Sequence, residues 1–121
     1  MWLQKRANSS LFFDGAANFN PGIARAGGVI RNVDGSIEHK YPWGLGHSTN
    51  MQAEAMALVQ GLKHLRDLGI EKVIILGDSQ SLIRILVDNM SPHDFRLARV
   101  VTRIRKLVGS FLQVNFFHDL Q

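Results

Sequence analysis

The first part of the chain alternates short apolar stretches with turn residues, a pattern that is typical of β-strands. The apolar stretches predict three strands, over residues 11–16, 24–33 and 37–45. Asp34-Gly35 separates the second stretch from the third, and this pair favours a two-residue hairpin between antiparallel strands. Pro42 cannot donate a backbone hydrogen bond, so it favours an edge position for the third strand. The chain is therefore predicted to open as an antiparallel meander, after a lead-in over residues 1–9.

The rest of the chain carries apolar residues at helical spacing, interrupted by one continuous apolar run. The spacing predicts three helices, between Thr49 and Gly69, between Ser79 and Asn89, and from Asp94 to Val108. Thr49 and Gln52 have the spacing of a capping box at the start of the first helix. The apolar run from Val73 to Leu76 predicts a strand that is buried on both faces, as in a parallel sheet. A last strand is predicted over residues 111–117.

The predicted order of elements is β-β-β-α-β-α-α-β, which indicates a single α/β domain over residues 1–121. Helix-linked crossovers are right-handed, and elements that follow one another in sequence tend to be neighbours in space. The first and fourth strands can therefore lie side by side and parallel. We expect a five-stranded mixed sheet, in which strands 1–3 form the antiparallel meander, strand 4 runs parallel to strand 1, and the helices pack on the sheet.

The composition excludes several kinds of protein. A chain of 121 residues can bury a core in one domain, and the absence of cysteine excludes disulfides and thiolate metal sites. No apolar run approaches the ~18 residues of a membrane span, and the N-terminus has no signal-peptide core. We therefore expect an intracellular protein, cytoplasmic or nuclear, with no membrane partner. The net charge of +4 mildly favours an anionic partner.

Three acidic residues occupy positions from which their side chains could meet. Asp14 lies inside the first apolar strand, next to Gly15, which lets another backbone or a ligand come close. Asp78 closes the fourth strand, and Glu54 lies at the edge of the buried stripe of the first helix. Three carboxylates near buried strands would repel one another strongly unless a cation lay among them. Oxygen ligands alone suit Mg²⁺ or Mn²⁺ rather than zinc.

Each of these acids also has a purely structural interpretation. Asp14 could cap a turn made by Gly15, because Asp-Gly is a common turn pair. Glu54 is predicted to lie in the first helical turn, where the helix dipole favours any acidic side chain. Either Asp78 or Ser79 could be the N-cap of the second helix.

Several short motifs accompany the three acids. They are Asp14-Gly15-Ala16-Ala17 with Asn20-Pro21-Gly22, Gly27-Gly28-Val29-Ile30-Arg31, Thr49-Asn50-x-x-Ala53-Glu54, and Gly77-Asp78-Ser79. Together they resemble the ribonuclease H type 1 family, and the likeness runs from about Leu11 to His118. The chain is most similar to the branch found in plants, often as a domain derived from retroelement reverse transcriptases.

The resemblance implies a ribonuclease H-like fold and an endoribonuclease that hydrolyses the RNA strand of RNA–DNA hybrids. It implies two ions of Mg²⁺ or Mn²⁺ and no small-molecule cofactor. The implied metal ligands, which are also catalytic, are Asp14, Glu54 and Asp78. The implied substrate contacts, in part with the 2′-hydroxyl that separates RNA from DNA, are Gly15, Asn20, Asn50 and Gln80. Turn, helix-start and helix-surface roles are the alternatives for the last three.

The C-terminal part departs from the family pattern, in which a fourth acid follows the last strand as His-x-x-x-x-x-Asn-x-x-x-Asp. His118 matches the histidine, whose implied catalytic role is to assist proton transfer or product release. The fourth acid would lie past Gln121, and Asp119 is in the wrong place for it. We therefore expect a C-terminally truncated form with weakened catalysis. The alternatives are a compromised module that binds nucleic acid or a protein partner, and, for His118, a surface residue at a strand end.

A stripe of basic residues is predicted along the third helix. Its members, at positions i, i+3, i+7 and i+10, are Arg96, Arg99, Arg103 and Lys106. The stripe could be a solvated helix face or a face that contacts phosphates.

Overall fold

The computed structural model describes residues 9–17, 22–31 and 37–118. The elements, in chain order, are β1 (Ser9–Ala17), β2 (Gly22–Arg31), β3 (Ile37–Ser48), α2 (Asn50–Asp67), β4 (Lys72–Gly77), α3 (Gln80–Val87), α4 (Phe95–Val108) and β5 (Gln113–His118). Residues 1–8 of the predicted lead-in, the Asp34-Gly35 turn and Asn20 lie outside the described residues, and Ser9, the last residue of that lead-in, begins β1.

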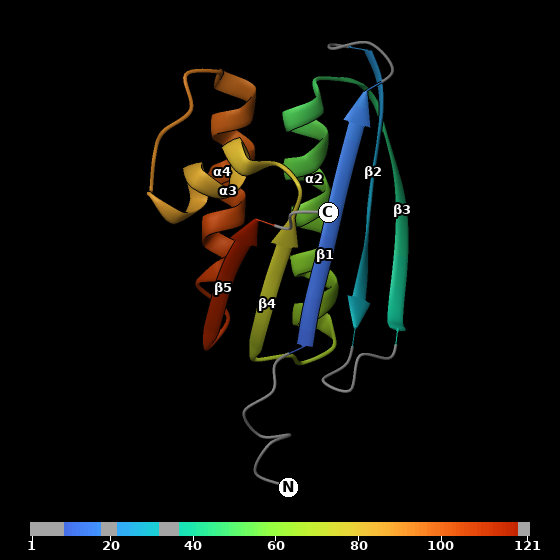
Figure 1. The fold of residues 1–121 in the computed structure, drawn as a ribbon, viewed down its shortest axis with the longest axis vertical. Coiled ribbons are helices and arrows are strands. Elements are labelled where there is room, and N and C mark those ends of the chain that lie inside the picture. The colour runs from blue at the N-terminus through green and yellow to red at the C-terminus, as the bar shows by residue number, and fades with distance from the viewer. Residues whose placement is uncertain (1–8, 18–21, 32–36, 119–121) are drawn as a thin grey trace, which may run out of the picture.

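The strands form one sheet in the order β3-β2-β1-β4-β5 (Figure 1). β1 pairs antiparallel with β2, and β2 pairs antiparallel with β3, which confirms the predicted meander. β4 pairs parallel with β1 and with β5. β3 lies at an edge of the sheet, where Pro42 predicts it.

The helices build the core against one face of the sheet. α2 packs on β1 and β2, and α4 packs beside α2 (Figure 1). The core consists of side chains that the strands and the helices bury against one another. The largest of those that are fully buried are Leu11, Phe13, Ile30, Leu58, Leu62, Leu65, Ile75, Leu82 and Ile104. None of the helices in the described part of the chain is long and apolar enough to cross a membrane.

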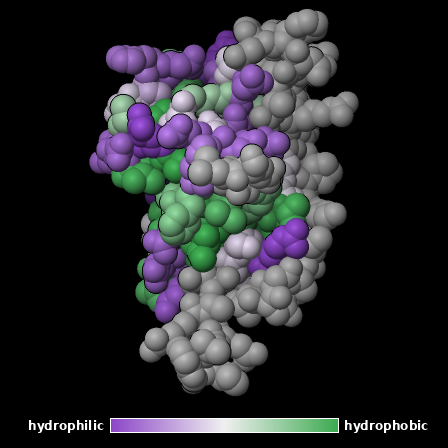
Figure 2. Space-filling model, viewed as in Figure 1, coloured by the Kyte–Doolittle hydropathy of each residue, from purple (hydrophilic) through white to green (hydrophobic). Residues whose placement is uncertain are grey.

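The prediction that β4 is buried on both faces is wrong. Val73 and Ile75 are buried, whereas Ile74 and Leu76 are only half-buried. Consecutive apolar residues point alternately to the two faces of a strand, and the described helices cover only the face of Val73 and Ile75. Figure 2 views the other face, on which apolar side chains gather over β4 and β5. Phe117, a residue of β5, is 52% exposed.

The ends of the first helix follow local chemistry. The Gln52 backbone N–H donates to Oγ1 of Thr49 (3.1 Å), and the Thr49 N–H donates to Oε1 of Gln52 (3.2 Å). These two bonds confirm the predicted capping box. Gly69 follows the helix with a φ of 76°, a backbone conformation that favours glycine. α2 is therefore fixed at the end that carries Glu54.

A close contact sets the spacing of β1 and β4 just before the two aspartates. The fully buried Phe13 ring packs on Gly77, with which Phe13 is paired across the two strands. A Cβ atom added to Gly77 would lie 2.5 Å from Cζ of Phe13. Only glycine therefore fits at this position without displacement of the ring.

Candidate active site

The two predicted aspartates directly follow the last residue pair between β1 and β4. That last pair is Phe13 with Gly77, and Asp14 and Asp78 come next in the chain. Both aspartates are exposed. Gly77 also pairs with His118 at the end of β5. Asp14, Asp78 and His118 therefore lie on or directly after three neighbouring parallel strands, at the carboxyl end of β4. This is the edge at which open α/β sheets bind ligands.

Glu54 is placed beside the aspartates by α2. The helix begins at Asn50, so Glu54 lies beyond its first turn, which contains no acidic residue. The prediction that Glu54 lies in the first turn is wrong. The effect of the helix dipole falls off within the first turn, so the dipole does not account for an acidic residue at position 54. Glu54 is instead half-buried in the part of α2 that packs on the sheet.

The environment of Glu54 disfavours its ionised form. Burial, which removes water from the carboxylate, raises the pKa of Glu54 to about 7, and the negative charge of Asp78 adds to the rise. A hydrogen bond from the Ser79 side chain lowers this pKa, and the negative charge of Asp14 raises it by the smallest of the four effects. Oε2 of Glu54 is buried and has no hydrogen-bond partner among the residues that the structure describes. The three acids therefore interact electrostatically, and one buried oxygen of Glu54 has no hydrogen-bond partner in the described part of the chain.

The N-cap of α3 is Ser79, which settles the choice between Asp78 and Ser79. Oγ of Ser79 accepts a hydrogen bond from the Leu82 backbone N–H at 3.3 Å. The Asp78 carboxylate is consequently not used as the cap. Sequence reasoning missed that the Ser79 hydroxyl also bonds Glu54, although its position next to Asp78 was a signal.

The described acids suit a cation in charge but do not form a ready ligand set. The buried, unpaired Oε2 of Glu54 and the repulsion from Asp78 and Asp14 are the features that a divalent cation would relieve. Within residues 9–17, 22–31 and 37–118, no three Asp, Glu or His side chains lie close enough together to hold one metal ion.

His118 reaches the same edge of the sheet from β5. Its Nε2 lies 3.0 Å from the backbone carbonyl oxygen of Asp78. A carbonyl oxygen only accepts hydrogen bonds, so Nε2 carries the proton in this contact. In the neutral ring Nδ1 then keeps a lone pair that can accept a proton. The structure thus brings His118 next to Asp78.

The predicted substrate contacts that the structure describes lie at the starts of α2 and α3 and near the end of β1. Asn50 is the first residue of α2 and half-buried, and Gln80 is the exposed first residue of α3. Gly15 lies in β1 opposite Ala26. A hollow of about 240 Å³ adjoins Gln80, and its lining residues are Gln80, Ser81, Arg84, Ile85 and Met90. Sequence reasoning missed this hollow because these residues have the pattern of an ordinary exposed helix face.

Known proteins resemble this chain over nearly its full length. Residues 12–120 match the family model described as reverse transcriptase-like. A ribonuclease HI of Halobacterium salinarum is 36% identical over 107 residues, which cover 88% of this chain and 54% of that protein. The chain thus spans about half the length of this curated relative.

Two solved structures share the fold. A crystal structure of RNase H1 from Halobacterium salinarum superposes with a TM-score of 0.89 at 32% identity and covers 94% of this chain and 86% of that chain. The crystal structure of LC11-RNase H1 in complex with an RNA/DNA hybrid gives a TM-score of 0.87 at 24% identity, with coverage of 94% and 86%. The arrangement of strands and helices is therefore that of these proteins.

Proposed function

The chain belongs to the ribonuclease H type 1 family, and we propose that it is a divalent-metal-dependent endoribonuclease that hydrolyses the RNA strand of RNA–DNA hybrids. One observation carries the proposal. The half-buried Glu54 carboxylate interacts with two other carboxylates and has a buried oxygen with no hydrogen-bond partner among the described residues. A divalent cation would offset both the repulsion and the unpaired oxygen.

Asp14, Glu54 and Asp78 are the residues proposed to hold the metal, as two ions of Mg²⁺ or Mn²⁺. When bound, the ions would lower the pKa of a water and stabilise charge on the attacked phosphate and the leaving oxygen. The protein contributes the position of the ligands: β1 and β4 hold the two aspartates, and α2 carries Glu54, whose pKa the Ser79 side chain lowers. Glu54, whose pKa is about 7, would hold the metal in its ionised form.

His118 is proposed to handle a proton rather than to bind metal. The Asp78 carbonyl engages Nε2 at 3.0 Å and so orients the ring at the edge of the site. Nδ1 stays outside this contact and is the ring nitrogen that can exchange a proton with the substrate or with water. This arrangement supports a role in proton transfer or in release of the product.

Recognition of the RNA strand is assigned to the starts of α2 and α3 and to the part of β1 near its end. Asn50 and Gln80 carry amide groups that can both donate to and accept from a 2′-hydroxyl. Gly15 leaves the backbone of β1 without a side chain beside Asp14. The net charge of +4 suits a polyanionic substrate, and the LC11 relative was crystallised with an RNA/DNA hybrid.

A second candidate function is a nucleic-acid-binding module with little catalytic activity. The observation that favours it is that no three Asp, Glu or His side chains in the described part of the chain form a metal-binding group. Phosphate contacts need only basic side chains and backbone groups, whereas cleavage needs close placement of the metal ligands.

Product analysis distinguishes the two candidates. Three duplexes of one sequence, an RNA–DNA hybrid, an RNA duplex and a DNA duplex, are incubated with the protein and Mg²⁺, each strand labelled in turn. We expect cuts only in the RNA strand of the hybrid, and their loss in Glu54→Gln but not in Glu71→Gln, a matched change at an exposed residue. Binding of the hybrid without any cutting would favour the binding module.

A further inference from the structure

A second charged site lies between α2 and α4, away from the three acids. It is a hollow of about 350 Å³, and its lining residues are Lys63, Arg66, Arg103, Lys106, Leu107 and Ser110. Lys63 and Arg66 lie nine and twelve residues after Glu54 on α2, which corresponds to about 14 and 18 Å along the helix. The hollow therefore takes in four basic residues from two helices, at a distance from the candidate active site.

The positive charge of the hollow is only partly compensated. In the described part of the chain, the one ion pair at the hollow joins Nε of Arg66 to Oδ1 of Asp67 at 3.6 Å, with both side chains at least half exposed. Both helices end here, and each helix C-terminus carries roughly half a negative charge. Asp67 and the two helix ends together offset about two of the four positive charges. Helix capping alone therefore does not explain why four cations converge.

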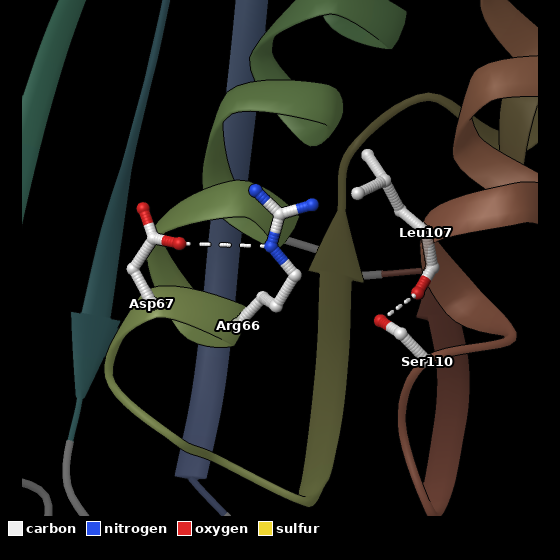
Figure 3. A network of polar contacts seen from close by, with 4 residues as sticks. All are labelled: Arg66, Asp67, Leu107 and Ser110. Atoms are coloured by element: carbon white, nitrogen blue, oxygen red, sulfur yellow. Dashed lines mark hydrogen bonds and ion pairs between the residues drawn. The ribbon is translucent and has the colours of Figure 1, made fainter.

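The Arg66 guanidinium is oriented so that it can bind a further anion. Its contact with Asp67 uses Nε, and the forked Nη end makes no hydrogen bond or ion pair with any residue that the structure describes. In Figure 3 the guanidinium has Asp67 on one side and Leu107 and Ser110 of the α4 end on the other. The Ser110 hydroxyl donates to the Leu107 carbonyl at 2.6 Å, which holds the turn that closes the hollow. An arginine fork is well suited to two oxygens of one phosphate.

The hollow continues into the basic stripe predicted along α4. Arg103 and Lys106 belong to both the hollow and the stripe. Arg99 and Arg96 extend the stripe toward the start of the helix. Cζ of Arg99 lies 5.8 Å from the centre of the Phe95 ring. The stripe is about 15 Å long, because it spans ten residues. At its far end Nε2 of Gln52 donates to Asp94 at 3.4 Å, which joins the N-termini of α2 and α4. The stripe thus leads from the end of α2 that carries Glu54 to the hollow.

We propose that this hollow is a phosphate-binding site, which the backbone of a nucleic acid lying along α4 or a free phosphate would occupy. The site combines three features. It has four cations, of which about two are uncompensated, an arginine fork with no partner among the described residues, and a hollow large enough for a phosphate with its ester groups. The site does not depend on metal binding at the three acids. Loss of cleavage and loss of phosphate binding are therefore separable results.

The test uses one variant with a charge removed from each helix and one matched control. Lys63→Gln/Lys106→Gln removes two cations of the hollow, and Lys72→Gln removes an exposed lysine that does not line it. Melting curves without ligand first confirm that both variants fold. One arm measures the affinity for an RNA–DNA hybrid by fluorescence anisotropy in EDTA, over a range of salt concentrations. The other arm measures the shift in melting temperature that inorganic phosphate and pyrophosphate produce.

The two arms separate the possible sources of the phosphate. If a nucleic acid supplies it, the double variant binds the hybrid on the order of tenfold or more weakly at 0.1 M salt, and the slope of log K against log salt falls by about two. If a free phosphate supplies it, the hybrid affinity stays within the range of Lys72→Gln, and phosphate stabilises the wild type but not the double variant. A double variant that matches Lys72→Gln in both arms overturns the proposal.

Discussion

Replacement of Glu54 by glutamine should change how stability depends on pH. In the wild type, burial and the charge of Asp78 raise the pKa of Glu54 to about 7, from 4.5 in the unfolded chain. The folded state therefore holds the proton more tightly than the unfolded state. The associated stability is fully present below pH 4.5 and is lost as the pH rises through 7. The glutamine variant has no group that titrates at this position.

The size of the effect follows from the shift in pKa. A rise from 4.5 to about 7 corresponds to at most about 3 kcal/mol of unfolding free energy. Glu54 is only half-buried, so solvent screening reduces the value, and we expect about 1–2 kcal/mol. Glu54→Gln should therefore gain about 1–2 kcal/mol relative to the wild type between pH 4.5 and pH 8. The amide is nearly isosteric with the acid, so packing of α2 should persist.

The assay is urea unfolding in chelator at half-unit steps from pH 4.5 to pH 8. The free energy of the wild type is subtracted from that of the variant at each pH, which cancels every group that titrates alike in both proteins. Glu71→Gln, the same change at an exposed residue, serves as the control. A difference for Glu54→Gln that rises no more steeply with pH than that of the control would refute the claim that the folded state raises the pKa of Glu54.

Further expectations concern the metal, the strand contact and the helix cap. Millimolar Mg²⁺ or Mn²⁺ should raise the melting temperature of the wild type and leave Glu54→Gln unshifted, because a ligand that binds only the folded state stabilises it; an equal shift in both would count against the site. Gly77→Ala should lower the unfolding free energy by about 1–3 kcal/mol in urea unfolding, because its Cβ would meet the Phe13 ring at 2.5 Å. Thr49→Ala should cost about 1 kcal/mol in the same assay through loss of the capping box, and an unchanged midpoint would show that the cap contributes little.

The parts of the fold that follow from local patterns could be predicted. Alternating apolar stretches indicated the meander, and the spacing of Thr49 and Gln52 indicated the capping box; the structure contains both. The pairing of β1 with β4 followed from the handedness of crossovers, and it brings Asp14 and Asp78 to the same edge.

Features that depend on which elements pack together could not be predicted. Half-exposure of Ile74 on β4 depends on which face the helices cover, and an apolar run carries no such information. Asp78 and Ser79 are equally good N-caps by residue type, so only the hydrogen bonds decide between them. The contact of His118 with Asp78 joins residues 40 positions apart. The basic hollow arises only because α2 and α4 lie side by side.

Metal-dependent cleavage by the three acids is tested by the rate at which a labelled RNA–DNA hybrid is cut, measured against Mg²⁺ concentration. Under the proposed function, cleavage by the wild type and by Glu71→Gln rises with Mg²⁺ and stops in chelator. Glu54→Gln should not cleave the hybrid at any Mg²⁺ concentration, since a metal-bound carboxylate would be lost. Cleavage by Glu54→Gln at the wild-type rate, or cleavage by the wild type that persists in chelator, would contradict the proposed function.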